Sequence, residues 1–204
     1  MRIMEKIDYI KEPARACFLS YHKNENTEIP SSMLVVRGDD YKPELYKSYD
    51  DTIYTKLISR SKDISEPTFP EGFKLATPTK EQLTAHISQC FPDGETPDSV
   101  DLWRYMEYFM VALIDSSTGK IVASAAADID FGIREGYIDW IAVSPRYRRR
   151  GLGTYLVNEL LYRFRRLSDF VSVSTKAPEA LALFQKCGFG EECEWHILKQ
   201  KKII

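Results

Sequence analysis

The clearest pattern in the chain is an apolar stripe between residues 152 and 164. Large apolar side chains recur there every three or four residues: Leu152, Leu156, Val157, Leu160, Leu161 and Phe164. This spacing places them on one face of a helix, because an α-helix turns once every 3.6 residues. The sequence therefore predicts an amphipathic helix that packs its apolar face on a sheet.

Strand patterns lie on both sides of this helix. Apolar or alternating runs bounded by turn residues are typical of β-strands. Such runs occupy residues 73–76, 108–115, 120–129, 137–143, 170–175 and 193–199. The polar turn between the second and third runs predicts a hairpin.

Two shorter helices are expected in the same part of the chain. Thr79 and Gln82 have the spacing of a capping box, which predicts a helix that runs to about residue 90. Pro178 suits the first turn of a second helix over residues 178–186, and Gly188 suits its end. This order of strands and helices predicts a mixed α/β (α+β) fold centred on one sheet.

The N-terminal third of the chain has a pattern of its own. It predicts helices over residues 5–21 and 50–61 and a strand over residues 33–37. Pro67, Pro70 and Gly72 then interrupt regular structure. We expect a boundary there, with an N-terminal helical and strand extension (1–70) of unknown role before a domain over residues 71–204. The extension could cover a site, mediate a homodimer or complete the fold.

Composition narrows the class of protein. The 204 residues are 44% hydrophobic and 28% charged, with a net charge of −2, which fits a globular protein and argues against a nucleic-acid partner. The four cysteines and three histidines show no metal-ligand spacing. The N-terminus lacks a signal-peptide pattern, and no apolar run reaches the roughly 20 residues of a membrane span. We expect a cytoplasmic protein with free thiols, no metal and no membrane contact.

Candidate chemistry lies in the loop before the long helix. Gly151 and Gly153 can take positive φ and allow an oligoanion to approach the main chain. The first amides of the helix, from Leu152 to Thr154, are available to donate to it. Four of the five residues from 146 to 150 are arginines, which raise the local positive potential. This pattern favours a bound pyrophosphate.

Two other phosphate-binding motifs do not match the spacing of the loop. A dinucleotide fingerprint requires a third glycine where Leu156 stands, and a Walker loop requires Gly-Lys-Ser/Thr, so neither fits. Two alternatives stay open. The glycines could form only a tight turn beside solvated arginines. The arginines could instead contact nucleic acid, in which case retention on DNA would be steeply salt-dependent.

Two motifs, one following the other along the chain, resemble those of a known family. Residues 140–153 have the sequence WIAVSPRYRRRGLG, which resembles the R/Q-x-x-G-x-G/A signature of the GNAT superfamily of acetyl-CoA-dependent N-acetyltransferases. Residues 180–189, ALALFQKCGF, resemble the A-x-x-L-Y-x-K-x-G-F segment of the same family. The resemblance covers about residues 73–199. It implies a single, mostly antiparallel mixed sheet flanked by helices, with acetyl-CoA as cosubstrate.

The resemblance also implies a set of cofactor-binding residues. The strand before the loop is expected to diverge from its neighbour and to bind the acetyl group and pantetheine arm, while the loop binds the pyrophosphate. The implied residues are Ile141, Ala142, Val143, Arg148, Arg149, Arg150, Gly151, Leu152, Gly153, Thr154, Ala177, Phe184 and Lys186.

Attack of an amine on a thioester requires a base and is helped by an acid. Strand alternation predicts Tyr137, Asp139, Ile141 and Val143 on one face, which makes Asp139 the candidate base. It could instead order a loop or pair with an arginine. Phe184 stands where the family usually has a proton-donating tyrosine, so the acid must be Tyr137, another tyrosine or solvent.

Charge suggests the class of acceptor. Residues 93–139 hold ten acidic and three basic residues, whereas basic residues gather in 146–166. This polarity suits recruitment of a cationic amine, although acidic loops also serve solubility alone. We therefore expect an N-acetyltransferase acting on the primary amine of a small molecule. A noncatalytic acyl-CoA-binding regulatory module stays open as the alternative.

Overall fold

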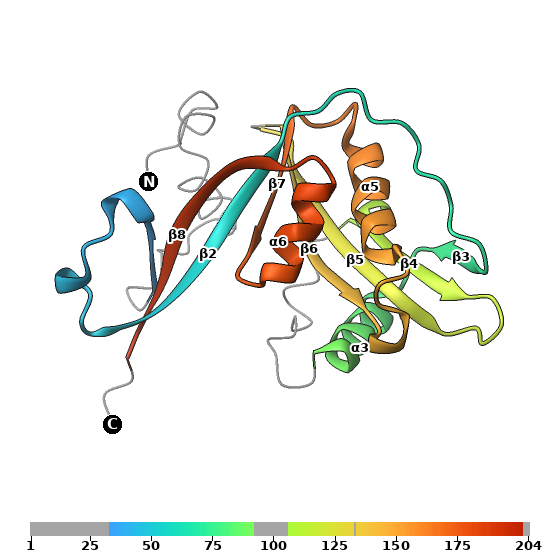
Figure 1. The fold of residues 1–204 in the computed structure, drawn as a ribbon, viewed down its shortest axis with the longest axis horizontal. Helices are drawn as coiled ribbons and strands as arrows, with labels where there is room; N and C mark the ends of the chain where they lie inside the picture. The colour runs from blue at the N-terminus through green and yellow to red at the C-terminus, as the bar shows by residue number, and fades with distance from the viewer. Residues whose placement is uncertain (1–32, 92–105, 133, 202–204) are drawn as a thin grey trace.

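The computed structural model describes residues 33–91, 106–132 and 134–201, and within them eight strands form one sheet (Figure 1). The strands are β1 (Met33–Arg37), β2 (Tyr49–Ser59), β3 (Phe73–Ala76), β4 (Met110–Asp115), β5 (Ile121–Asp130), β6 (Glu135–Val143), β7 (Phe170–Thr175) and β8 (Gly190–Gln200). Their order is β1-β8-β2-β7-β6-β5-β4-β3. Only the β6–β7 pair is parallel among the described strands, so the expected mostly antiparallel sheet is confirmed.

Helices cover both faces of the sheet. The three α-helices described are α3 (Lys80–Cys90), α5 (Leu152–Phe164) and α6 (Pro178–Lys186), and the short 3-10 turns are η1 (Gly38–Asp40), η2 (Pro43–Leu45), η3 (Glu107–Phe109) and η4 (Pro145–Tyr147). Alternate residues of β4 face two different cores. Val111 and Leu113 join the core under α5 and α6, whereas Met110 joins the core under α3. The sheet is therefore sandwiched between α5 and α6 on one side and α3 on the other.

The apolar stripe of α5 is the centre of the larger core. Leu152, Leu156, Leu160 and Phe164 are each at most 1% exposed, which confirms the helix predicted from their spacing. Gly136 of β6 allows this close packing, because a Cβ there would lie 2.8 Å from the Phe164 ring. The helix and the sheet are thus in direct contact where β6 begins.

The capping box of α3 is also confirmed. Thr79 Oγ1 accepts a hydrogen bond from the amide of Gln82 at 3.2 Å, and Gln82 Oε1 accepts one from the amide of Thr79 at 2.9 Å. These reciprocal bonds satisfy two backbone donors at the start of the helix. The sequence alone therefore determines where α3 begins.

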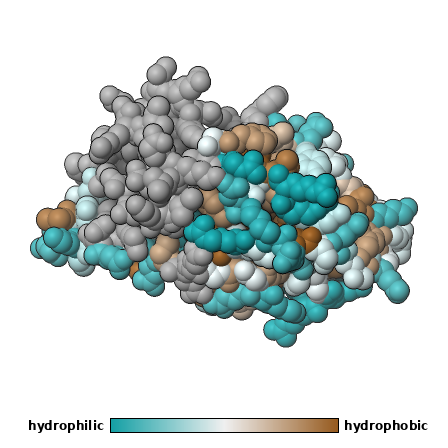
Figure 2. Space-filling model, turned by 90° about the horizontal axis from the view of Figure 1, so that it is seen from above, coloured by the Kyte–Doolittle hydropathy of each residue, from teal (hydrophilic) through white to brown (hydrophobic). Residues whose placement is uncertain are grey.

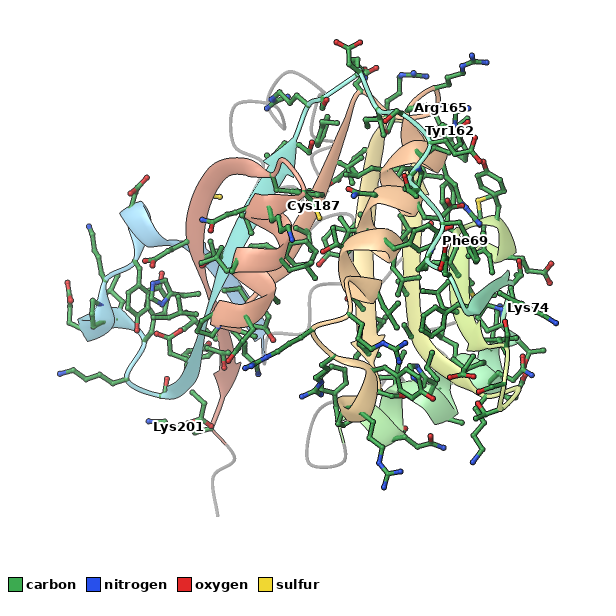
Figure 3. All side chains as sticks on the ribbon, turned by 45° about the vertical axis from the view of Figure 1, so that its right-hand side comes forward. Phe69, Lys74, Tyr162, Arg165, Cys187 and Lys201 are labelled. Atoms are coloured by element: carbon green, nitrogen blue, oxygen red, sulfur yellow. The ribbon has the colours of Figure 1, made fainter. Side chains whose placement is uncertain are left out.

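The segment between β2 and β3 crosses the outer side of α5. Phe69 packs edge-on against Tyr155 of α5, with ring centroids 5.4 Å apart (Figure 3). The described part of the face seen in Figure 2 mixes hydrophilic and hydrophobic residues. No helix within the described ranges is long and apolar enough to cross a membrane.

The helix predicted over residues 50–61 is wrong, because this segment is strand β2. It pairs with β8 on one side and β7 on the other, with Tyr54 opposite Trp195 and Leu57 opposite Val173. Its β-branched and aromatic residues fit a strand, and the backbone partners on both sides override a helical pattern. The predicted strand 33–37 is confirmed as β1, and the predicted helix 5–21 lies outside the described residues. The boundary near residue 70 stays a prediction.

Candidate active site

The two parallel strands at the centre of the sheet stay paired over a short distance only. Glu135, Gly136 and Tyr137 of β6 pair with Phe170, Val171 and Ser172 of β7, after which both strands run on to Val143 and Thr175 without further pairing to each other. Figure 1 shows the two strands diverging. Backbone groups of β6 beyond Tyr137 are therefore not used in a ladder with β7, and an amide-rich ligand can pair with such groups as an added strand does.

A β-bulge interrupts β6 directly after the point of divergence. Asp139 pairs with Ala126 of β5 and Ala142 with Ser124, so Trp140 and Ile141 together oppose one residue. Trp140 has φ of 48°, in the left-handed region. One extra residue in a strand shifts the alternation of its side chains.

This bulge corrects the predicted face. Ile138 is buried in the core under α5, and Ile141 and Val143 pack against the same core. Tyr137 lies next to Ile138 and therefore points to the opposite face, together with Asp139. The prediction that Tyr137, Asp139, Ile141 and Val143 share one face is wrong, because strict alternation does not survive the bulge.

Hydrogen bonds hold the loop where it leaves β6. The amide of Ser144 donates to the carbonyl of Val122 in β5 at 2.9 Å, and the amide of Tyr147 donates to the carbonyl of Ser144 at 2.8 Å. Arg148 Nε donates to the carbonyl of Val143 at 3.2 Å. These bonds fix the path by which the chain leaves β6.

The outer side of the loop rests on the β4–β5 hairpin. The Tyr147 hydroxyl donates to Asp115 Oδ2 at 2.8 Å. Hydrogen bonds from the Ser117 hydroxyl and from Tyr147 hold the pKa of Asp115 below its ordinary value. Arg150 stacks over the rings of Tyr147 and Phe73, at 5.3 Å and 5.1 Å from their centroids. The arginine-rich loop is thus placed by an ordered turn.

The two glycines of the loop are required for different structural reasons, the backbone conformation at Gly151 and the space around Gly153. Gly151 has φ of 79° and is the N-cap of α5. Gly153 is helical, so of the two glycines only Gly151 has the positive φ that was expected for both. Arg149, in the same loop, also has a positive φ, of 63°. A Cβ on Gly153 would lie 3.3 Å from Leu183 Cδ2 and 3.7 Å from Val143 Cγ2. Gly153 therefore marks a close meeting of β6, α5 and α6.

The start of α5 differs from the start of α3. Gly151 provides no side-chain cap, and the first helical bond runs from the amide of Tyr155 to the carbonyl of Gly151 at 2.9 Å. The amides of Leu152, Gly153 and Thr154 precede that bond. Amides of this kind, at the positive end of a helix dipole, suit an anion.

The candidate residues of α6 lie at its two ends and in its buried face. Ala177 is its exposed N-cap, and its amide donates to Thr175 Oγ1 at 3.1 Å. Lys186 is its exposed last residue. Phe184 is 4% exposed and packs against Phe189, with ring centroids 5.6 Å apart. Burial raises the pKa of the neighbouring Cys187 (Figure 3) to about 11, so that thiol stays protonated near neutral pH.

Tyr137 and Asp139 lie on the face of the sheet that α3 covers. Tyr137 packs with Trp195 and Tyr54, and Asp139 Oδ1 accepts a hydrogen bond from the amide of Trp140 at 2.9 Å. Directly opposed residues of antiparallel strands share a face. Asp128 opposes Tyr137 in this way, and Asp130 opposes Glu135. Asp128, Asp130, Glu135 and Asp139 therefore lie on this face.

The structure adds two residues that the sequence did not single out. Glu135 is 1% exposed, accepts a hydrogen bond from Ser172 Oγ and lies 3.4 Å from Nζ of Lys56, which is fully buried. Ser172 belongs to the last β6–β7 pair, so this buried polar group stands where the strands begin to diverge. Lys56 was missed because its segment resembled a helix, and Glu135 because it follows a turn.

The site thus combines a diverging parallel strand pair, a glycine loop and a helix start without a side-chain cap, an arrangement that suits a ligand with amide groups and an anionic end. Residues 80–189 match the model of the acetyltransferase (GNAT) family, and the chain therefore belongs to that family. The predicted resemblance is thereby confirmed. No curated protein matches the chain.

Solved structures show the same fold. A GCN5-related N-acetyltransferase from Sphaerobacter thermophilus has a TM-score of 0.59 at 19% identity, over 84% of this chain and 60% of that one. One from Kribbella flavida has a TM-score of 0.61 at 16% identity, over 84% and 68%. A glucosamine N-acetyltransferase region of a fungal multi-domain GH3 β-N-acetylglucosaminidase has 0.60 at 15% identity, over 84% and 24%. The chain spans 60%, less than two thirds, of the length of the Sphaerobacter protein.

Proposed function

We propose that the chain transfers an acetyl group from acetyl-CoA to the primary amine of a small molecule, by direct attack in a ternary complex. The observation that carries this proposal is the divergence of β6 from β7 beyond Tyr137 and Ser172. The arginine-rich loop follows β6, and the carboxylates lie on the α3 face of the sheet. The two substrates would approach that opening from opposite faces of the sheet. Family membership supports the acyl transfer, and the amine class rests on the charges of the α3 face.

The residues of the loop fit a pyrophosphate group. Gly151 has left-handed geometry and provides no cap, and Gly153 has no Cβ where β6 meets α6. Acetyl-CoA would supply the thioester that carries the acetyl group. The residues proposed to hold it follow the motifs: Ile141, Ala142, Val143, Arg148, Arg149, Arg150, Gly151, Leu152, Gly153, Thr154, Ala177, Phe184 and Lys186.

Two side chains of β6 are proposed to move protons. The attacking amine must lose a proton, and the carboxylate of Asp139 would accept it, directly or through a water. The hydroxyl of Tyr137, on the same face of β6, would donate a proton to the departing thiolate. Both lie near the bulge, where β6 is already separated from β7.

The acceptor is proposed to be a cationic amine. Asp128, Asp130 and Asp139 share the α3 face, and a field of this sign attracts ammonium groups, whereas the charge of Glu135 is paired with Lys56. The glucosamine named for the fungal neighbour is one amine of this kind, and it supports inclusion of amino sugars among the candidates.

One observation favours the second candidate, a noncatalytic acyl-CoA-binding module. Phe184 has no proton to donate, and its ring is buried against Phe189. Loss of one general acid costs about 10²–10⁴ in rate, so the buried phenylalanine weighs against turnover without excluding it.

The test separates binding from turnover. Calorimetry with CoA measures binding, and thiol release with a panel of polyamines, amino sugars, amino acids and basic peptides measures transfer. The proposal predicts CoA binding and turnover of cationic amines. CoA binding without turnover across the panel favours the module, turnover of neutral or anionic acceptors alone contradicts the amine class, and absence of CoA binding contradicts both.

Asp128 provides a matched control for Asp139. Each carboxylate accepts a hydrogen bond from the amide of the next residue, at 2.8 Å for Asp128 and 2.9 Å for Asp139. Asp139→Asn should lower kcat by about 10²–10⁴. Asp128→Asn should raise KM for the amine and leave kcat within a few-fold. Equal effects of the two substitutions on kcat would remove Asp139 as the base.

A further inference from the structure

A buried histidine joins α3 to the start of the arginine loop. His86 is 3% exposed. Its Nδ1 shares a hydrogen bond of 2.7 Å with Ser124 Oγ of β5, and its Nε2 shares one of 3.0 Å with Ser144 Oγ. Ser144 is the residue that follows β6 and precedes η4. One imidazole ring thus connects a helix, a central strand and the exit of β6.

Ser144 is the pivot of this connection. Its amide donates to Val122 of β5, and its carbonyl accepts from Tyr147 inside the loop. Its hydroxyl bonds to His86. Two of these contacts are made by the backbone and are independent of residue type, whereas the third requires both a hydroxyl at 144 and a ring nitrogen from α3.

We infer that His86 is a positioning residue for the arginine loop (residues 144–151), because its bridge from Ser124 to Ser144 sets the direction in which the chain leaves β6. The inference rests on the proposed function, since it concerns the same loop. His86 lies on the α3 face, and nothing in its geometry gives it a part in the chemical step.

The chemistry of the bridge suits a neutral imidazole. Each serine hydroxyl can donate or accept, so either neutral tautomer satisfies both partners. Burial lowers the pKa of His86 and keeps the ring neutral. The backbone of Val122 also lies near the ring. Cys90 Sγ is 3.5 Å from Nε2, and burial raises the pKa of this thiol, so it is neutral as well.

Two substitutions at position 86 divide the bridge into its halves. An asparagine amide lies near the place of Nδ1 and can retain the bond to Ser124, but it does not reach Ser144. A glutamine amide lies near the place of Nε2 and can retain the bond to Ser144. The inference predicts that His86→Asn weakens CoA binding about 5- to 30-fold, the range expected from losing a buried hydrogen bond that holds a loop, whereas His86→Gln stays within about 3-fold of the wild type.

Two further variants make the comparison specific. Ser144→Ala should reproduce the effect of His86→Asn, and the double variant should be no weaker than either, because both remove one interaction. His196 is the control for loss of a buried histidine. It is 7% exposed and bonded to Asp51 at 2.8 Å in the outer part of the sheet, so His196→Asn should leave CoA binding unchanged.

The measurements are the calorimetric Kd for CoA, KM for acetyl-CoA and for the amine, and hydrogen exchange of residues 144–151 without ligand. We expect His86→Asn to raise Kd and KM for acetyl-CoA, to leave KM for the amine unchanged and to speed exchange in the loop. Equal Kd for the asparagine and glutamine variants, or an equal loss in His196→Asn, would overturn the inference. If the wild type binds no CoA, the proposed function fails, and unchanged loop exchange in His86→Asn alone would then overturn the positioning role.

Discussion

Replacing Lys56 by methionine should destabilise the fold more than any surface change. Its ammonium group and the carboxylate of Glu135 lie 3.4 Å apart, with side chains 0% and 2% exposed. Methionine keeps most of the length of the lysine side chain and removes its charge. The carboxylate of Glu135 would then stay buried, with the Ser172 hydroxyl still donating to it but the ammonium lost.

The magnitude follows from the geometry. At 3.4 Å and an effective dielectric constant of about 20, two unit charges attract by about 5 kcal/mol. Removing one partner of a buried pair typically costs about 3–5 kcal/mol in free energy of unfolding, because the other charge is left without compensation. Lys56→Met should lose that amount. The double variant with Glu135→Gln should recover most of it, since the glutamine is neutral and can still accept from Ser172.

Equilibrium urea unfolding of the wild type, both single variants and the double variant gives the coupling free energy of the pair. We expect a coupling of at least about 2 kcal/mol that changes little between low and high salt, because buried pairs are weakly screened. A loss below about 1 kcal/mol in Lys56→Met, or additive losses in the double variant, would refute the assignment of a buried ion pair at this position.

Three further predictions concern the glycines and the loop. Gly136→Ala should lose about 1–3 kcal/mol in urea unfolding, because its Cβ would meet a buried phenylalanine ring of α5 at 2.8 Å; an unchanged midpoint would contradict that contact. Gly151→Ala and Gly119→Ala, with φ of 79° and 68°, should each lose about 1–2 kcal/mol, but calorimetry should show weaker CoA binding only for Gly151→Ala. Tyr147→Phe should raise the pKa of Asp115 in a carboxyl NMR titration, because the hydroxyl stabilises the charged form. The wild type loses that stabilisation as the pH falls below about 4, and the variant should lose less of it.

Residues with local causes could be predicted from the sequence. The capping box of Thr79 and Gln82, the stripe from Leu152 to Phe164 and the αL position of Gly151 each depend on neighbours a few residues away. Their physical causes are helix periodicity, capping and the freedom of glycine. The loop motif and its place between a strand and a helix follow from the same causes.

Residues with distant partners could not be predicted in this way. The segment around Lys56 is a strand because β8 and β7 supply hydrogen bonds from more than 100 residues away in sequence. The bulge at Trp140 is a matter of register with β5, and it moves Ile141 and Val143 to the face opposite Tyr137 and Asp139. The bridge of His86 depends on Ser124 and Ser144, which come 38 and 58 residues later.

The sequence by itself therefore determined the order of elements after residue 70, the glycine loop and the family. Each of these is encoded in short windows, where backbone geometry and side-chain periodicity act directly. Tertiary structure alone decided which face of β6 each candidate residue occupies, that β2 is a strand inside the sheet, and that Glu135 and Lys56 are buried together where β6 and β7 diverge. These features arise from strand pairing and register, and one extra residue in a strand is enough to exchange its two faces.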